Sequence, residues 1–456
     1  MMASKSKRAR MSPQRNYAKT FMYWAISIFV IKLIIIFSIS AGNINIFTKP
    51  YLVDGAWLGA DGENYLSGFN ALLRDGIFSK ESVLSYWPAG YPLIILLLSI
   101  LGKSWVLTTL SIAQSLIFSF SVYLFASQLA RTRLKKYAYL VFLLIILNPT
   151  LSLSSIVVGY ESLTASGFLI AAGLIIKDFS EKDNNKFKKY LLINSIIFGV
   201  LTFVQPRLIL SGILINFVWI LIRKGVKVGS LLLAASLLIS LFFPATLIYR
   251  NHQANGINNV STNLGTTMNL GAGDKATGGY KSEEKGVTCA NPSDNALVKC
   301  VLNWYVSNPT KAAKLFYNKT LYFWSPWFGP EANGTMARNP WLKISPLVNI
   351  ASNSTGGGDL VYGGIGKLIS WLWLVAGIGL IIYGFIILWR LGSLEKLIGT
   401  IAMIAVSTNW LISLISIGDH RFRLPIMGMS LFMQVIGIKT LFKKGKVQVV
   451  DGPALR

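Results

Sequence analysis

The sequence predicts an all-α protein, a polytopic bundle of about ten transmembrane helices with two large loops on the non-cytoplasmic side. Three observations predict it: an apolar composition, apolar segments that recur along the chain, and a one-sided distribution of lysine and arginine. Hydrophobic residues make up 53% of the chain and charged residues only 14%. A soluble domain carries roughly 25% charged residues. Lipid must therefore replace water around much of this chain.

Apolar segments long enough, or nearly long enough, to cross ~30 Å of hydrocarbon recur along the chain. They fall at residues 20–41, 104–129, 138–153, 162–177, 189–204, 207–222, 228–248, 366–389, 397–416 and 425–442. A long basic tail precedes the first segment, which at about 22 residues fits an uncleaved first span rather than a signal peptide.

The connecting segments set the expected orientation. With the N-terminus inside, 25 lysines and arginines fall on cytoplasmic segments, whereas three arginines fall in short outside turns. This asymmetry places both termini in the cytoplasm. The net charge of +26 does not indicate nucleic-acid binding, because the basic residues form short clusters between apolar runs rather than a patch beside aromatic residues.

The topology divides the chain into three regions. Residues 1–248 form an N-terminal membrane module whose first outside loop is 42–103. Residues 249–365 form a large outside loop, and 366–456 form the C-terminal helices and a cytoplasmic tail. Pro88–Gly102 is apolar but too short to span and contains two prolines, so we expect an interfacial or re-entrant helix there.

Acidic residues concentrate on the outside. Only five of the 18 aspartates and glutamates fall on cytoplasmic segments, and both histidines, His252 and His420, are outside. An acid or base used in catalysis would therefore act on that side.

The first outside loop contains two carboxylates next to a helical pattern. Tyr65, Phe69 and Leu72 have the spacing of an amphipathic helix that can lie on the membrane face. Asp61 and Glu63 fall at the start of that helix. They can serve as an N-cap and a partner of the helix dipole, or as catalytic groups at the lipid–water boundary.

A further carboxylate and several arginines lie at span ends on the same side. Glu161 begins the fourth span, where a carboxylate is costly unless it faces protein or water. Arg207, Arg250, Arg421 and Arg423 are outside, where the charge asymmetry disfavours them. Recognition of a phosphate would explain them, because the guanidinium fork matches phosphate oxygens. Anchoring to lipid headgroups is the alternative.

The second outside loop contains small polar residues, glycines and both cysteines of the chain. Asn263 and Asn269 belong to stretches that bind sugar or phosphate hydroxyls or simply form turns. Cys289 and Cys300 share this loop, which favours a disulfide in an oxidising compartment over two separate thiols. We find no His/Cys metal spacing, phosphate-binding loop or nucleophile elbow in the sequence.

Taken together, these motifs resemble the GT-C superfamily of polyprenyl-phosphate-sugar-dependent glycosyltransferases, which includes protein O-mannosyltransferases and lipid A aminoarabinose transferases. The resemblance runs from the first span to Pro425. Its motifs are Asp61–Tyr65, Pro88–Pro92, Glu161–Leu163, Pro206–Arg207, the Arg-Asn entry to the second loop, its Ser-Thr-Asn and Asn-Leu-Gly segments, and Arg421–Pro425. Gly62 departs from the pattern, because many relatives have a second acidic residue there. So does Trp87, where a basic residue is common.

The resemblance implies a transfer reaction on the outside of the membrane. The donor would be a sugar on a polyprenyl phosphate, and the acceptor a hydroxyl of a glycan, lipid or protein. Asp61, with Glu63 beside it, would take the acceptor proton in an inverting displacement. The implied substrate-binding residues are Tyr65, Glu161, Arg207, Arg250, Asn263, Asn269, His420, Arg421 and Arg423.

Other functions remain open at this stage. A transporter or flippase of a lipid-linked sugar would use the same arginines for binding alone, and a polysaccharide polymerase or ligase would share the donor. Against transport, Lys32 is the only ionisable residue expected in mid-membrane, and no inverted repeat is visible. The resemblance names no certain cofactor and leaves a divalent metal open. It also implies a multi-pass protein of the bacterial cytoplasmic (inner) membrane.

Overall fold

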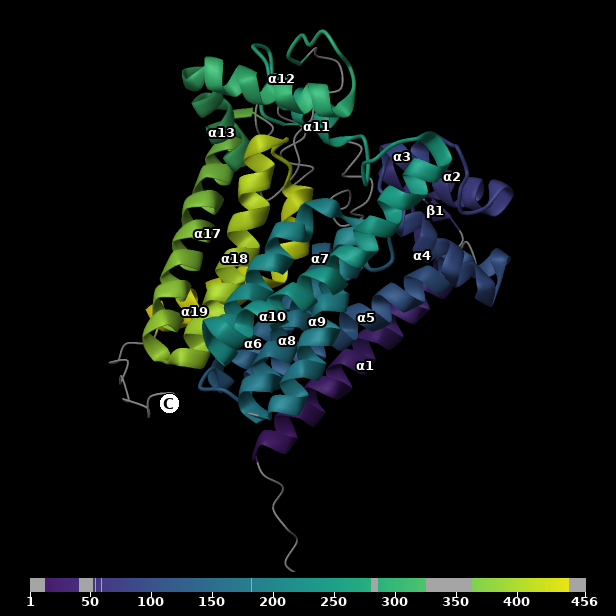
Figure 1. Ribbon diagram of the computed structural model, residues 1–456. Helices are drawn as coiled ribbons and strands as arrows, with labels where there is room; N and C mark the ends of the chain where they lie inside the picture. The colour runs from purple at the N-terminus through teal and green to yellow at the C-terminus, as the bar shows by residue number, and fades with distance from the viewer. Residues whose placement is uncertain are drawn as a thin grey trace, which may run out of the picture.

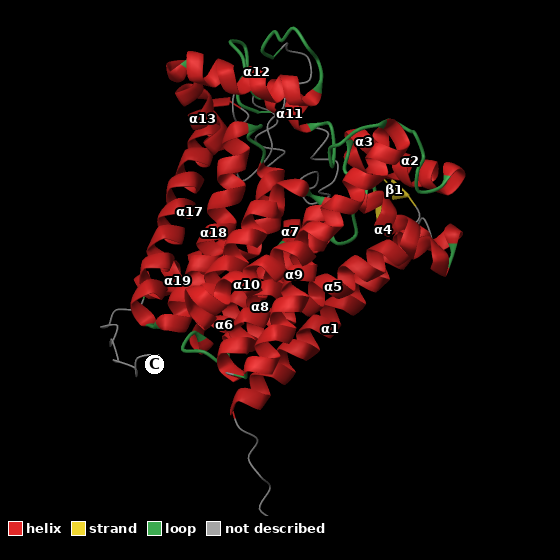
Figure 2. Ribbon diagram, viewed as in Figure 1, coloured by secondary structure: helices red, strands yellow, loops and turns green. Residues whose placement is uncertain are grey.

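The computed structural model describes residues 13–40, 52–53, 55–58, 60–181, 183–279, 286–324 and 363–442. The basic N-terminal tail, residues 325–362 of the predicted second outside loop and the C-terminal tail lie outside these ranges. The fold is almost entirely helical, as the sequence predicts (Figure 2).

The membrane bundle contains the long helices of the chain. They are α1 (Pro13–Ser40), α5 (Val106–Leu129), α6 (Lys135–Ile146), α8 (Glu161–Glu181), α9 (Asn184–Val204), α10 (Ile209–Asn255), α17 (Gly363–Leu391), α18 (Ser393–Ile415) and α19 (Met427–Leu441). Shorter helices gather mainly at one end. They are α2 (Ala60–Asp75), α3 (Val83–Tyr86), α4 (Gly90–Leu98), α7 (Pro149–Ser154), α11 (Leu264–Leu270), α12 (Asp294–Ser307) and α13 (Pro309–Trp324).

Short turns and strands complete the described structure. The 3-10 turns are η1 (Ser99–Leu101), η2 (Lys103–Trp105), η3 (Pro206–Leu208) and η5 (His420–Ile426), and the strands are β1 (Leu52–Val53) and β2 (Ala56–Trp57). Figure 1 places α2, α3, α11 and α12 at one end of the bundle, and the start of α1 and the end of α19 at the other. The start of the first helix and the end of the last helix thus lie on the same side of the bundle.

Eight described helical segments are long and apolar enough to cross a membrane. One of them, α10, comprises two of the predicted spans, because the chain reverses at Gly225 (φ 69°, ψ −177°). Asn216 donates a hydrogen bond to the Ser236 hydroxyl at 3.0 Å. In a straight helix, residues 20 positions apart would be about 30 Å apart. The two halves of α10 therefore form a helical hairpin, with a glycine where the backbone needs positive φ.

The predicted span 138–153 is wrong as one continuous helix. The chain instead forms α6 and α7, which are separated at Asn148. Pro149 cannot continue the hydrogen bonding of α6 but fits the first turn of a new helix, and the Asn148 side chain accepts a hydrogen bond from the Leu151 amide at 3.0 Å. The apolar run concealed this break.

A large hydrophobic core runs through the bundle. It joins residues of the early helices, such as Phe21 and Phe125, to residues of the late ones, such as Ile401 and Phe432. Phe125 and Phe432 contact each other edge to face, with ring centroids 5.5 Å apart. The N-terminal module and the C-terminal helices therefore pack as one body rather than as separate units.

The first outside loop packs onto the end of this bundle. The predicted stripe of α2 is buried, with Tyr65, Phe69 and Leu72 each 5% exposed or less. It lies against protein, chiefly α4, rather than against lipid. The apolar segment within Pro88–Gly102 forms a short helix, Gly90–Leu101, with exposed Ile100 and Leu101 at its end. Its length fits the predicted interfacial or re-entrant segment.

Candidate active site

The candidate site lies where four segments meet at the loop-bearing end of the bundle. The first turn of α2 supplies Asp61, the start of α8 supplies Glu161, and η5 supplies Arg421. The turn η3, between α9 and α10, supplies Arg207. Residues spread over 360 positions of sequence are thereby gathered in one place.

Arg421 lies between two carboxylates. Its Nη1 donates to Asp61 Oδ2 at 2.7 Å, and its Nε lies 3.7 Å from Glu161 Oε1. The three side chains are 10%, 15% and 5% exposed, for Arg421, Asp61 and Glu161 respectively. Asp61 is therefore the more accessible carboxylate, and Glu161 the more deeply held one. Low exposure strengthens these charge interactions relative to a solvated pair.

Arg207 brings a second guanidinium to the site. Its guanidinium carbon lies 3.9 Å from the centre of the Phe422 ring, an arrangement typical of a cation–π contact. Its Nε and Nη2 atoms are buried and have no hydrogen-bond acceptor among the described residues. Buried donors without acceptors are costly. These two N–H groups can therefore donate hydrogen bonds to an anion.

Asp419 supports the turn that carries Arg421, and sequence reasoning did not single it out. Its Oδ1 accepts a hydrogen bond from the Arg421 amide at 2.8 Å, which makes it the N-cap of η5. The side chain is 3% exposed, and this burial raises the pKa of Asp419 to about 7. The signal for it was an aspartate directly before a short turn, which is typical of a cap.

Buried aromatic residues pack beside the site. Tyr65 packs edge to face on Tyr91 and Tyr160, with centroids 5.0 and 6.1 Å away. Burial raises the pKa of Tyr65 well above its ordinary value, so its hydroxyl stays neutral. Gln205 donates a hydrogen bond to the Tyr160 hydroxyl at 2.7 Å. Tyr65, predicted as substrate-binding, therefore adjoins the site as part of its apolar wall.

The structure does not bring every predicted residue to this centre. Glu63 is exposed on α2 and forms none of the described ion pairs of the site. Arg250 is buried and donates to the backbone oxygens of Ile77 (3.0 Å) and Ser79, so it joins the two outside loops. A Cβ added to Gly62 would lie 2.8 Å from Leu58 Cδ1 and 3.1 Å from the Val158 backbone oxygen. A side chain at 62 would therefore require these neighbours to shift.

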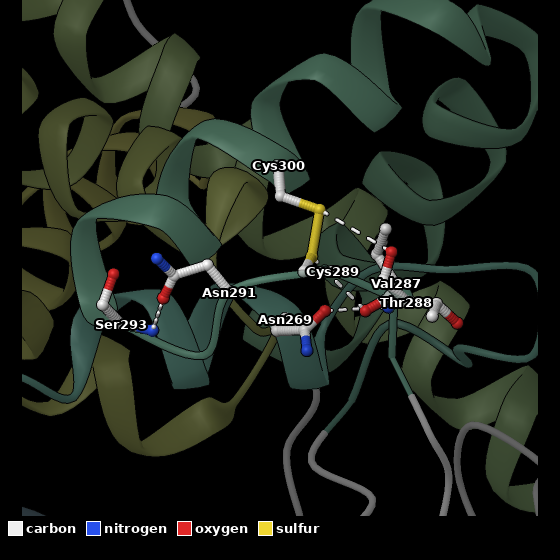
Figure 3. Close-up of a disulfide and its surroundings, with 7 residues drawn as sticks. All are labelled: Asn269, Val287, Thr288, Cys289, Asn291, Ser293 and Cys300. Carbon is white, nitrogen blue, oxygen red and sulfur yellow. Dashed lines mark hydrogen bonds between the residues drawn. A yellow bond between two sulfur atoms is a disulfide. The ribbon is translucent and has the colours of Figure 1, made fainter.

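The remaining predicted residues lie near α11 or on η5. Asn263 precedes α11, and its side chain accepts a hydrogen bond from Ser261 at 3.2 Å. Asn269 accepts from the Val287 amide at 2.8 Å, beside the bond that joins Cys289 to Cys300 (Figure 3). These contacts organise the outside loop.

Two predicted residues of η5 flank Arg421. His420 is buried at the start of the turn. Arg423 Nη1 donates to the backbone oxygen of Trp324 at 2.8 Å, and its guanidinium lies 5.6 Å from the Trp324 ring. Arg423 therefore attaches η5 to the end of α13, whereas Arg421, two residues earlier, contacts Asp61.

The described residues of the site show no cluster of metal-binding side chains. Among the residues that the structure describes, no group of three or more histidines, cysteines, aspartates or glutamates is arranged to hold one. Asp61 and Glu161, the two carboxylates that share the site, share the guanidinium of Arg421 instead.

No protein-family model matches the sequence, and no curated protein matches it either. Solved structures that resemble the chain include the oligosaccharyltransferase AglB of the archaeon Archaeoglobus fulgidus in complex with an inhibitory peptide and a dolichol-phosphate (13% identity, TM-score 0.46, covering 92% of this chain and 50% of that one). The apo form of the A. fulgidus oligosaccharyltransferase (15%, 0.47, 92% and 51%) and a form tethered with an acceptor peptide (13%, 0.45, 92% and 50%) also match.

This chain spans about half the length of those proteins. The function is inferred from the residues of the site.

Proposed function

We propose that the protein is an integral-membrane glycosyltransferase that moves a sugar from a polyprenyl phosphate to a hydroxyl acceptor on the non-cytoplasmic side. The observation that carries the proposal is the Asp61–Arg421–Glu161 arrangement with Arg207 beside it. It combines an accessible carboxylate with two guanidinium groups at the end of a membrane bundle. A hydroxyl acceptor needs the first, and a departing lipid phosphate needs the second.

The proposed reaction is a direct displacement. The acceptor oxygen attacks the anomeric carbon, and Asp61 takes the hydroxyl proton as the new carbon–oxygen bond forms. The bond from the anomeric carbon to the phosphate oxygen breaks, and the polyprenyl phosphate leaves with both bonding electrons. Arg207 and Arg421 stabilise its negative charge. Attack opposite the leaving group inverts the anomeric configuration.

Glu161 is proposed to orient Arg421 rather than to take the proton. Its carboxylate is 5% exposed and lies 3.7 Å from the guanidinium Nε, behind the Asp61 contact. Without a negative charge there, Arg421 would be a poorly held cation. This role assigns the base to Asp61 and leaves the exposed Glu63 outside the reaction.

The test is transfer by purified protein in lipid nanodiscs, supplied with labelled polyprenyl-phosphate sugars and a panel of glycan, lipid and peptide acceptors. We expect Asp61→Asn to lower the turnover rate ~10²-fold or more, because an amide cannot accept the proton. Its amide oxygen can still accept a hydrogen bond from Arg421, so folding and donor binding should persist. Glu63→Gln is the matched control and should keep its turnover.

Loss of turnover in Glu63→Gln with full activity in Asp61→Asn would move the base to Glu63. Full activity in both would contradict the assignment of this loop to catalysis. Tight donor binding by wild-type protein without transfer to any acceptor would favour transport of a lipid-linked sugar.

A further inference from the structure

The segment that leads into Glu161 has irregular backbone although it is buried. Residues from Ser155 to Tyr160 lie between α7 and α8 outside any helix, and each is 2% exposed or less where its exposure is given. Buried amides and carbonyls outside regular structure must find other partners. The hydrogen-bond partners of this backbone therefore restrain the position of the first residues of α8.

Two buried side chains supply these partners. The Tyr91 hydroxyl, on α4, accepts a hydrogen bond from the Gly159 amide at 2.8 Å and donates one to Gln114 Oε1, on α5, at 3.2 Å. Gln114 Nε2 donates to the backbone oxygens of Val157 at 3.1 Å and Ser155 at 3.4 Å. Tyr91 and Gln114 are at most 1% exposed. The Tyr91 hydroxyl and the Gln114 side-chain amide thus form hydrogen bonds with three backbone groups of the segment, at Ser155, Val157 and Gly159.

The other edge of the segment pairs with the strand that precedes Asp61. The Trp57 amide donates to Ile156 O at 3.0 Å, and the Val158 amide donates to Trp57 O at 2.9 Å. Asp61 follows Trp57 by four residues. The same short segment therefore sets the position of both carboxylates that bind Arg421.

A fixed backbone at Gly159 also fixes the Glu161 carboxylate. A Cβ added to Gly159 would lie 2.4 Å from Glu161 Oε2, so the carboxylate packs directly on this backbone. Any movement of Gly159 would change the distance from Glu161 to Arg421. The hydrogen bond from the Gly159 amide to Tyr91 restrains that movement.

The segment also accounts for a lysine buried within the first span. Lys32 is 2% exposed; its Nζ donates to Ser155 Oγ at 2.9 Å and lies 4.2 Å from the centre of the Phe118 ring. A lysine inside a membrane span is expensive and usually has a defined role. Here it attaches α1 to the start of the segment.

We infer that Tyr91 and Gln114 are positioning residues that hold the Glu161–Arg421–Asp61 arrangement in its reactive geometry. Neither touches the site's ion pairs directly; each acts through the backbone from Ser155 to Gly159. The inference rests on the proposed function for its catalytic consequence. Its structural part, the energetic coupling between Tyr91 and Glu161, does not depend on what reaction the protein catalyses.

The test replaces Tyr91 by phenylalanine, which keeps the ring packed on Tyr65 and removes only the hydroxyl. Tyr137→Phe is the matched control, because Tyr137 is 2% exposed and its hydroxyl lies 3.2 Å from the Thr440 hydroxyl, at the other end of the bundle. We expect Tyr91→Phe to lower kcat ~10-fold or more with little change in the KM for the donor, since misplaced catalytic groups slow the chemical step. Tyr137→Phe should leave both constants unchanged.

A second measurement does not depend on any activity. Melting temperatures of Tyr91→Phe, Glu161→Gln and the double variant in nanodiscs form a double-mutant cycle. We expect the shifts to be non-additive, whereas Tyr137→Phe and Glu161→Gln should give additive shifts. Additive shifts for Tyr91 and Glu161, or equal kcat in Tyr91→Phe and Tyr137→Phe, would overturn the inference. Absence of transfer in wild-type protein alongside non-additive shifts would instead contradict the proposed function.

Discussion

At the scale of single residues, the site is organised by its two arginines. Arg421 contacts both carboxylates, and Arg207 stacks on Phe422 with two donors free of acceptors in the described structure. A guanidinium suits this place because it remains charged when partly buried and binds phosphate with two parallel hydrogen bonds. The two arginines differ in their protein contacts: Arg421 lies against two carboxylates, whereas Arg207 Nε and Nη2 have no acceptor in the described structure.

Arg207 gives a direct prediction for donor binding. We expect Arg207→Ala to weaken binding of a labelled polyprenyl phosphate by about tenfold or more, because a charge-assisted contact contributes roughly 1.5–3 kcal/mol. Arg207→Lys should recover only part of the affinity, since lysine lacks the planar fork and the stacking surface. Equilibrium binding in nanodiscs measures this. Arg133→Ala, which alters an exposed arginine bonded to Leu391 O in another turn, serves as the control.

Unchanged affinity in a folded Arg207→Ala variant would assign Arg207 to packing on Phe422 alone.

Asp419 gives a prediction for pH. Burial raises the pKa of Asp419 from 3.8 to about 7 in the folded protein. Between these values the folded state keeps the proton and the unfolded state has lost it. The contribution of Asp419 to stability therefore decreases as pH rises from about 4 to about 7 and is level above that.

Asp419→Asn retains the cap on η5 without the charge. The melting temperature of this variant minus that of wild type should therefore be larger at pH 8 than at pH 5. A difference that is the same at both pH values would contradict the raised pKa of Asp419.

At the scale of elements, a buried lysine joins the outside helices to the bundle. Lys319 of α13 is fully buried, and its Nζ donates to the Tyr305 hydroxyl at 2.7 Å, Leu414 O at 2.9 Å and Ser416 O at 2.6 Å. The last two acceptors are at the C-terminus of α18, where carbonyls lack helical partners and a cation is favourable. One side chain thus caps α18 and fixes α13 against it.

Lys319→Met should loosen this junction. It leaves the two carbonyls at the end of α18 and the Tyr305 hydroxyl without their hydrogen-bond donor, at a cost of roughly 1–3 kcal/mol. Hydrogen exchange of α12 and α13 should become faster, while exchange in the bundle core should change little. Lys311→Met on the same helix is the matched control, because Lys311 forms an exposed pair with Asp274 (2.8 Å) that contributes little. Equal exchange in the two variants would contradict the capping role of Lys319.

At the scale of the whole molecule, the chain closes one bundle from its first helix to its last. The core joins early and late helices, so η5, which precedes α19, reaches the start of α8 and the first turn of α2. Short helices and the candidate site gather at the end opposite the start of α1 (Figure 1). The lysine and arginine asymmetry predicts an orientation of this body in the membrane, and cysteine labelling can test that prediction.

Cysteine labelling tests that orientation. Cys289 and Cys300 are bonded to each other, so a new cysteine is the reactive thiol of the described chain. A cysteine at 133 should react only with a reagent supplied from the cytoplasm. A cysteine at Lys275, an exposed position near Thr277, should react with a membrane-impermeant reagent supplied from outside. Outside labelling at 133 would invert the later loops and make Pro88–Gly102 a true span.

The sequence by itself determined the fold class and most of the helices, because the pattern that specifies a membrane helix is local. An apolar run of sufficient length and a biased distribution of lysine and arginine need no tertiary information. Local patterns also identified Asp61, Glu161, Arg207 and Arg421 as candidates. The break at Pro149 was missed because hydropathy takes no account of one missing backbone donor.

Only the tertiary structure decided which candidates meet. Arg207 and Arg250 have the same chemistry in the sequence, yet one faces the site and the other binds the backbone at Ile77 and Ser79. Asp61 and Glu63 are two residues apart, and the turn of α2 pairs one with Arg421 and exposes the other. Tyr91 and Gln114 read as ordinary interior residues until the irregular segment before Glu161 is placed between them. Partner choice depends on contacts between distant segments, and no local pattern encodes it.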